Sequence, residues 1–285
     1  MISLLSSRLQ RPAQWMLLLA LVLPAPLCAA DRATAPAAPA NDTLRHAIQA
    51  EKSTDARDGY YVWTDRLQKP RGSVTKLMVS TPVGILSRTV AINDRPLTAD
   101  ERKLDDDRIN RLLDPAKMQE KAKHQKDDEL HIERLLSALP DAFRCEYNTG
   151  QHDDRNLHLD CEPNPGFSPK NFESQILQGM KATILIDRED GRLAHIDGTL
   201  FKDVSFGMGI LGRLSRGHIE IVQARVVGKH WGIQHLALSF DGRIIVVKPV
   251  HIDETETSWD YRSVPAMTVA QALDYLRSAP YKPAH

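Results

Sequence analysis

The feature that most constrains the fold of this chain is a series of long β-strands between Met180 and Glu254. The apolar patterns predict strands over residues 181–188, 192–204, 218–227, 231–240 and 243–253. Short turns such as Glu189-Asp190-Gly191 and Asp241-Gly242 separate them. Because turns this short leave no room for a helical crossover, neighbouring strands should pair antiparallel and form a meander.

Shorter elements flank this region. A helix is expected from Asp42 to about Lys52, and Ser168-Pro169 and Thr268 each mark the start of another helix. The alternation of apolar and polar residues predicts three further strands over residues 60–68, 73–81 and 85–92. The chain therefore combines many strands with a few helices.

Residues 98–139 read as a helical insertion between the two groups of strands. Thr98 and Glu101 have the spacing of a capping box, in which each side chain satisfies a backbone N–H at the helix start. Asp114 and Pro115 then mark a restart, with Asp114 as N-cap and Pro115 at the first helical position.

Several of the long strands are apolar on both faces. Ile244 to Val247 is a continuous apolar run, and residues 219–227 carry aliphatic side chains at both parities. A sheet with one face in water would alternate more regularly, so both faces need a covering. We therefore expect a mainly β protein of the α+β class, an antiparallel open or half β-barrel capped by helices.

The sequence favours a disulfide between Cys145 and Cys161. Both residues lie in alternating segments separated by a turn-rich stretch, and a hairpin symmetric about Asp153 places them directly opposite each other. Two alternatives stay open at this point. The cysteines could be free buried thiols, or they could form a metal site with His152 and His158.

The first 30 residues have the features of a secretory signal peptide. The apolar run Trp15–Leu23 is shorter than the roughly 20 residues needed to span a bilayer, and prolines and small residues follow it. Cys28 could instead be a lipidated cysteine, although Leu27 replaces the small residue expected before it, and a retained signal anchor is a further alternative. Residues 31–40 read as a Pro/Ala-rich disordered linker. The expected location is the periplasm or cell envelope.

Residues 41–285 are expected to form a single domain without catalytic residues, metal ligands or cofactors. Acidic and basic residues balance at 37 each, so nothing favours binding to nucleic acid. Residues 207–212 match GxGxxG, but a strand rather than a helix should follow, which argues against a dinucleotide site. These glycines better suit a tight apolar loop. No HExxH or GxSxG motif is present.

The order of the elements resembles the bacterial periplasmic lipoprotein-carrier (LolA/LolB-like) fold. The shared order is signal peptide, helix, three-strand meander, inserted helices and a long antiparallel meander, and it spans most of residues 42–254. The resemblance implies an unclosed barrel with an apolar cavity for acyl chains. Its candidate lining residues are Tyr61, Trp63, Leu77, Val79, Ile219, Ile221, Leu236 and Leu238, with Phe206, Met208, Ile210 and Leu211 at the rim.

The resemblance predicts a non-catalytic protein that binds an apolar ligand, which would be a lipid, an acyl chain or a lipoprotein. Two other classes stay open. One is a structural or assembly factor of the envelope, with a filled interior and a peripheral membrane or envelope-protein partner. The other is a metal-dependent hydrolase built around the histidines. A ligand cavity separates the carrier from the assembly factor, and a metal separates the hydrolase from both.

Overall fold

The computed structural model describes residues 38–54, 59–151, 153–206, 212–244 and 248–279. Residues from Ala38 onward form one compact unit. The predicted signal peptide, most of the linker, His152, and three of the four rim residues (Met208, Ile210 and Leu211) lie outside the described residues. The predictions for them stay predictions.

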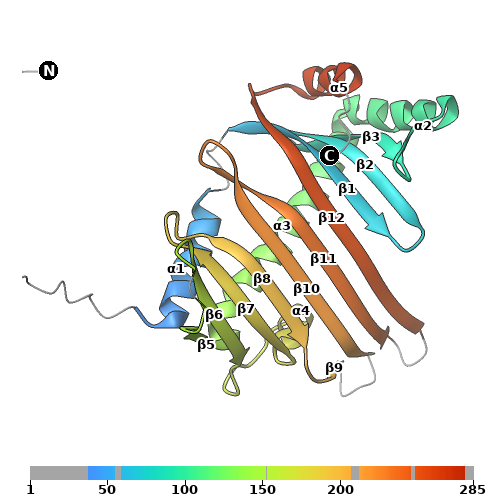
Figure 1. Ribbon diagram of the computed structural model, residues 1–285. Coiled ribbons are helices and arrows are strands. Elements are labelled where there is room, and N and C mark those ends of the chain that lie inside the picture. Colours follow the sequence, from blue (N-terminus) through green and yellow to red (C-terminus); the bar gives the residue numbers. More distant parts are fainter. Residues whose placement is uncertain (1–37, 55–58, 152, 207–211, 245–247, 280–285) are drawn as a thin grey trace, which may run out of the picture. The chain divides into compact units, whose positions relative to one another are not determined.

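The described chain forms one sheet of 12 strands, in the order β4-β3-β2-β1-β12-β11-β10-β8-β7-β6-β5, with β9 paired to β10 (Figure 1). Every pairing is antiparallel. The end strands β4 and β5 do not pair with each other within the described part, so this sheet is open. The predicted fold class is confirmed.

The strands are β1 (Tyr60–Lys69), β2 (Gly72–Thr81), β3 (Gly84–Ile92), β4 (Arg95–Pro96), β5 (Phe143–Tyr147), β6 (Asn156–Pro163), β7 (Met180–Asp187), β8 (Leu193–Leu200), β9 (Val204–Phe206), β10 (Gly212–Val227), β11 (His230–Ile244) and β12 (Lys248–Val264). The helices are α1 (Ala40–Thr54), α2 (Ala99–Asn110), the 3-10 turn η1 (Arg111–Leu113), α3 (Pro115–Ala142), α4 (Phe172–Leu177) and α5 (Val269–Ser278).

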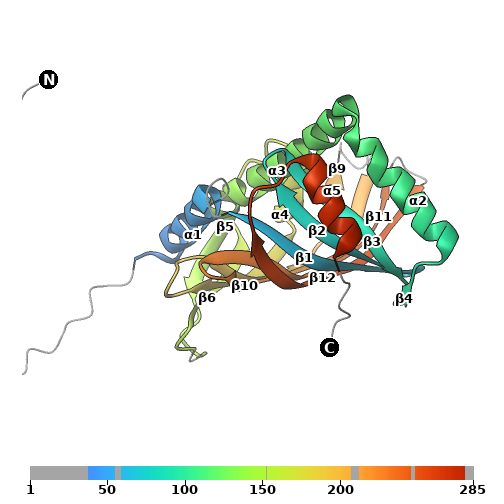
Figure 2. The same ribbon diagram turned by 90° about the horizontal axis from the view of Figure 1, so that it is seen from above.

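Helix α3 crosses the sheet from one end of the strand order to the other (Figure 2). Its N-terminal part contacts β3, and its C-terminal part contacts β5 and α1. The predicted start signals are confirmed, because Asp114 accepts a hydrogen bond from the Ala116 N–H and Pro115 occupies the first turn. The predicted capping box of Thr98 and Glu101 at the start of α2 is also present.

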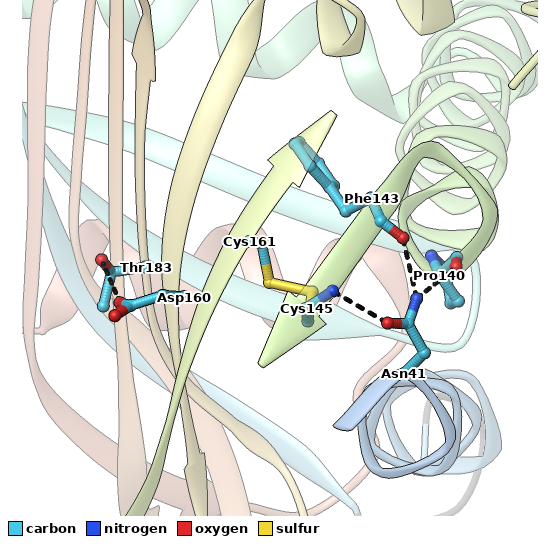
Figure 3. Close-up of a disulfide and its surroundings, with 7 residues drawn as sticks. All are labelled: Asn41, Pro140, Phe143, Cys145, Asp160, Cys161 and Thr183. Carbon is cyan, nitrogen blue, oxygen red and sulfur yellow. Dashed lines mark hydrogen bonds between the residues drawn. A yellow bond between two sulfur atoms is a disulfide. The ribbon is translucent and has the colours of Figure 1, made fainter. Parts of the chain in front are cut away.

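A side chain from α1 forms hydrogen bonds with backbone groups at the outer edge of β5. The Asn41 amide donates to the carbonyls of Pro140 and Phe143, both at 2.8 Å, and its carbonyl accepts from the Cys145 N–H at 2.8 Å (Figure 3). A side-chain amide carries the same donor and acceptor as a peptide group. Asn41 therefore supplies the hydrogen bonds that another strand would otherwise make.

Helix side chains cover the outer edge of β3 in the same way. Gln125 of α3 accepts from the Ile85 N–H at 3.0 Å and donates to the Ile85 carbonyl at 2.9 Å. In α2, Asp105 accepts from the Thr89 N–H at 3.2 Å, and Arg108 donates to the Ser87 carbonyl. Because an unpaired strand edge readily adds another strand, these contacts keep the sheet open and unextended.

The predicted disulfide is confirmed, so neither free thiols nor a cysteine metal site is present. Cys145 pairs directly with Cys161 in the β5–β6 register, and their sulfurs are bonded. The hairpin is symmetric about Asp153, as the sequence indicates. Closing a 16-residue separation should stabilise the fold by about 3 kcal/mol in the chain-entropy model.

Two predicted features of the long strands are wrong. Asp241 and Gly242 were expected in a turn but pair within β11, opposite His251 and Val250. Gly242 is needed for close packing, because a Cβ there would lie 2.4 Å from the Arg213 carbonyl oxygen. The strand expected over 192–204 is interrupted after Leu200, where the Phe201 N–H donates to the Gly179 carbonyl instead of to a neighbouring strand.

Helix α4 begins later than predicted. Ser168 and Pro169 were expected to start it, but Asn171 is the N-cap and the helix covers Phe172–Leu177. Asn171 accepts from the Ser174 N–H at 2.8 Å, and the Ser174 hydroxyl returns a bond to the Asn171 carbonyl. This pair of local bonds sets the start of the helix.

Two apolar clusters hold the helices to the sheet. The first lies between β5–β8 and helices α1, α3 and α4, and includes Leu44, Ile48, Leu139, Leu159, Ile184, Ile186 and Leu193. The second lies between β1–β3 and helices α2, α3 and α5, and includes Val62, Leu77, Val79, Leu86, Ile109, Met118, Leu273 and Leu276. Each end of α3 is anchored in one cluster.

Candidate ligand-binding site

The predicted lining residues of β1 and β2 lie on opposite faces of the sheet. Leu77 and Val79 are buried in the second apolar cluster and share a face with Val62, which pairs with Val79. Side chains alternate along a strand, so Tyr61 and Trp63 point to the other face. The structure therefore does not bring these four residues to one cavity.

The predicted lining residues of β10 and β11 do lie together. Ile219 pairs with Leu238, and Ile221 pairs with Leu236, so the four side chains form two adjacent rows on one face. All four are half-buried. The row of Ile221 and Leu236 continues to Ile196 of β8. Phe206, the one rim residue that the structure describes, is buried in the first apolar cluster.

This aliphatic row continues into polar residues on β12. Leu236 pairs with Glu256, which in turn pairs with Leu67 of β1. Directly opposite residues project to the same side of a sheet, and Trp63 is on this side of β1 because it alternates with Leu67. We call this side, which carries Ile196, Ile221, Leu236, Glu256 and Trp63, the inner face.

A cavity of about 720 Å³ lies at the end of the sheet where the β2–β3 and β10–β11 turns meet. It is lined from the sheet by Tyr61, Trp63, Glu256 and Tyr261, among others, and from α3 by Glu129. The cavity thus lies between the inner face and the helix that crosses it. Its size is that of a small-molecule site.

Aromatic rings form much of the cavity wall. Tyr61 stacks on His230 with ring centroids 3.8 Å apart, and Trp63 lies parallel to Tyr261 at 5.8 Å. The Tyr261 hydroxyl donates to the Ile233 carbonyl at 2.7 Å, which fixes the ring. Burial raises the pKa of Tyr261 to about 12, so its hydroxyl stays protonated.

The sequence pattern predicted Tyr61 and Trp63 as lining residues but not Tyr261. The predicted strand stopped at Asp253, whereas β12 continues to Val264. The pairing of β1 with β12 also shifts register between Val62 and Thr64. Asp260, next to Tyr261, has φ of 54°, a conformation that aspartate tolerates better than most residues. Such a bulge changes which side chains face inward, and no periodic pattern predicts it.

Two carboxylates lie together on the inner face. Asp65 is buried and accepts a hydrogen bond from the Ser258 hydroxyl at 2.9 Å. Burial and, after it, the nearby Asp65 carboxylate raise the pKa of Glu256 to about 7, while Lys76 acts in the opposite direction. Neither carboxylate has an ion-pair partner within 4.0 Å among the described residues.

Several histidines lie near carboxylates, and two of them share one carboxylate. His158 lies 3.1 Å from Asp153, and His195 lies 3.2 Å from Glu220, which is 4.0 Å from His235. Within the described part of the chain, no group of three or more His, Cys, Asp or Glu side chains is arranged to hold a metal ion. Nothing in this part of the molecule assigns a metal to the site.

No family model and no curated protein matches this sequence. Among solved structures, it is similar to a DUF1329 family protein from Desulfovibrio piger, at 8% identity and a TM-score of 0.28, covering 84% of this chain and 98% of that one. It is also similar to a LolA superfamily protein from Nitrosomonas europaea, at 9% identity and a TM-score of 0.25, covering 80% and 96%.

At these TM-scores, neither match carries an argument about the family of this chain or about what the chain binds. As to a membrane, no helix in the described ranges is long and apolar enough to cross one.

Proposed function

We propose that this chain is exported to the periplasm or cell envelope and there binds the apolar chain of a lipid, a fatty acid or a lipoprotein without catalysing a reaction. The observation that carries the proposal is the half-buried aliphatic row of Ile221 and Leu236, which runs through Glu256 into the cavity under α3. An apolar surface left partly uncovered inside a fold is typical of a ligand site.

The way α3 is held supports this proposal. Its ends are anchored, since Met118 and Leu139 are buried in the two apolar clusters. Its middle section is exposed instead, with Leu130 37% and Ile132 60% accessible. The helix therefore spans the inner face without filling the space beneath it with its own aliphatic side chains.

Tryptophan fluorescence tests this proposal. A dodecanol brominated on its alkyl chain should quench the mature protein at saturable, roughly equimolar concentrations, because Trp63 lines the cavity. Trp63→Phe should remove a large part of the quenching, and the remainder should come from Trp231, which lines the same cavity. Trp259→Phe is the matched control, since Trp259 pairs with Thr64 and so lies on the face opposite to Trp63. Absence of saturable quenching in the unmodified chain would contradict the proposal.

The alternative of an envelope assembly factor has one observation in its favour. An apolar hollow of about 630 Å³ lies between the start of α3 and the start of α5, and Val83 and Leu113 there are 48% and 50% exposed. Such a surface suits a protein partner. A chain that binds no alkyl probe but forms a stable complex through this hollow would favour the alternative.

A further inference from the structure

We propose that the cavity selects amphiphiles with a cationic, amine-bearing head, which binds at Glu256 beside the aromatic rings of the cavity wall while the alkyl tail lies along Leu236, Ile221 and Ile196. This inference rests on the proposed function, because it names the chemical class of the ligand. It concerns the polar end of the site, which the aliphatic rows alone leave undefined.

The polar and apolar parts are in line. Glu256, Leu236, Ile221 and Ile196 are successive cross-strand partners on β12, β11, β10 and β8. Neighbouring strands are about 4.8 Å apart, so this row is roughly 14 Å long. A single extended alkyl chain can lie along it with its head at the carboxylate end.

The charges at that end favour a cation. Arg192 lines the cavity but forms an ion pair with Glu51 of α1 at 2.5 Å, and both side chains are only 11% exposed. Of the charged groups that act on Glu256, Asp65 and Glu254 are acidic and Lys76 is basic, so ionised carboxylates outnumber the base at this end. An anionic head would therefore meet net repulsion, and an ammonium group would gain a charge-assisted hydrogen bond.

The aromatic wall favours the same ligand. The face of a tryptophan or tyrosine ring attracts a cation within about 6 Å of its centroid. Trp63 and Tyr261 lie parallel, with centroids 5.8 Å apart, and both line the cavity together with Glu256. Because the Tyr261 hydroxyl is held by the Ile233 carbonyl, its ring is already oriented before a ligand arrives.

Calorimetric titration of the mature chain at pH 8 with dodecylammonium, dodecanol and dodecanoate, each below its micellar concentration, tests the inference. We expect dodecylammonium to bind at least about ten times more tightly than dodecanoate. Glu256→Gln should weaken dodecylammonium binding about tenfold and leave dodecanol binding unchanged. Glu162→Gln is the matched control, because Glu162 is paired with Lys181 at 2.6 Å on β6 and does not line this cavity.

The outcomes separate the inference from the proposed function. Binding of dodecanoate as tightly as dodecylammonium, or an equal loss for dodecanol in Glu256→Gln, would overturn the cationic head while leaving an alkyl-binding protein. Binding of none of the three compounds would overturn both. Should Glu256→Gln fail to fold, the ranking of the three ligands on the unmodified chain still decides the question.

Discussion

At the scale of single residues, Glu256 is the side chain on which the proposed ligand site depends most. It lies on the inner face between the aliphatic rows and the aromatic wall, beside the buried Asp65. A carboxyl group in such a place is unfavourable for the free protein unless it is protonated or meets a cation. The same residue can therefore weaken the empty fold and strengthen the complex.

This position makes stability depend on pH. The pKa of folded Glu256 is raised from its ordinary 4.5 to about 7, so its contribution to stability is complete below pH 4.5 and is lost as the pH rises through 7. The charged groups that act on it are Asp65, Lys76 and Glu254, with Lys76 opposing the other two.

Glu256→Gln should therefore stabilise the free protein more at pH 8 than at pH 5. Because the side chain is still partly in contact with water, we expect a gain of about 1–2 kcal/mol at pH 8 over that at pH 5. Urea denaturation at the two pH values measures this difference. An equal effect at both pH values would contradict a raised pKa. Glu162→Gln is the control, because it breaks a comparable exposed pair with Lys181 on β6, away from Glu256, and should show no such gain.

At the scale of elements, the edges of the sheet are closed by helix side chains rather than by strands. Asn41 replaces a neighbouring strand at β5, and Gln125 does so at β3. The sheet stays open because these amides occupy the positions that a closing strand would need.

Asn41→Ala should destabilise the fold by about 1–3 kcal/mol, because the N–H of the buried Cys145 loses its acceptor. Gln49→Ala is the control, since Gln49 is an exposed residue of the same helix and should change stability by less than about 0.5 kcal/mol. Chemical denaturation of the two variants measures the effect. Equal stabilities would mean that Asn41 does not hold the edge.

The β5–β6 hairpin offers a second test at this scale. Replacing Cys145 and Cys161 with serine should lower the free energy of unfolding by about 3 kcal/mol. Both cysteines are buried in the first apolar cluster. The loss of unfolding free energy should therefore be at least as large as for a disulfide in an exposed hairpin. Thermal unfolding of the variant, and of the unmodified chain with and without reductant, measures this loss. An unmodified chain whose unfolding does not change with reductant would contradict a stabilising disulfide.

Local signals predicted most of the elements correctly. The Thr98 capping box, the Asp114-Pro115 restart and the cysteine hairpin depend on neighbouring residues, and all three are present. Asp241-Gly242 was misread because a glycine needed for close packing has the same sequence signature as one needed for a turn. A turn glycine and a close-packed glycine differ only in whether another strand lies against the residue, and the local sequence does not specify this.

At the scale of the whole described unit, the first and last strands in the sequence, β1 and β12, pair with each other. This pairing brings Tyr61 and Tyr261 into the wall of the same cavity. No periodic pattern specifies that pairing, and the register shift between Val62 and Thr64 depends on it. The aliphatic half of the site could therefore be predicted from alternation along β10 and β11. Tyr61 and Trp63 of the aromatic half were also predicted from β1, whereas Tyr261 and the acidic residues Asp65 and Glu256 were not.

Native mass spectrometry of the protein, purified gently from the cells that produce it, tests the central claim most directly. We predict one apolar adduct per chain, which solvent extraction releases as an amphiphile and which Ile221→Arg loses. Leu104→Arg is the control, since Leu104 is 70% exposed on α2, and it should keep the adduct. A bare mass, with no uptake of added dodecanol or dodecylammonium, would contradict the claim.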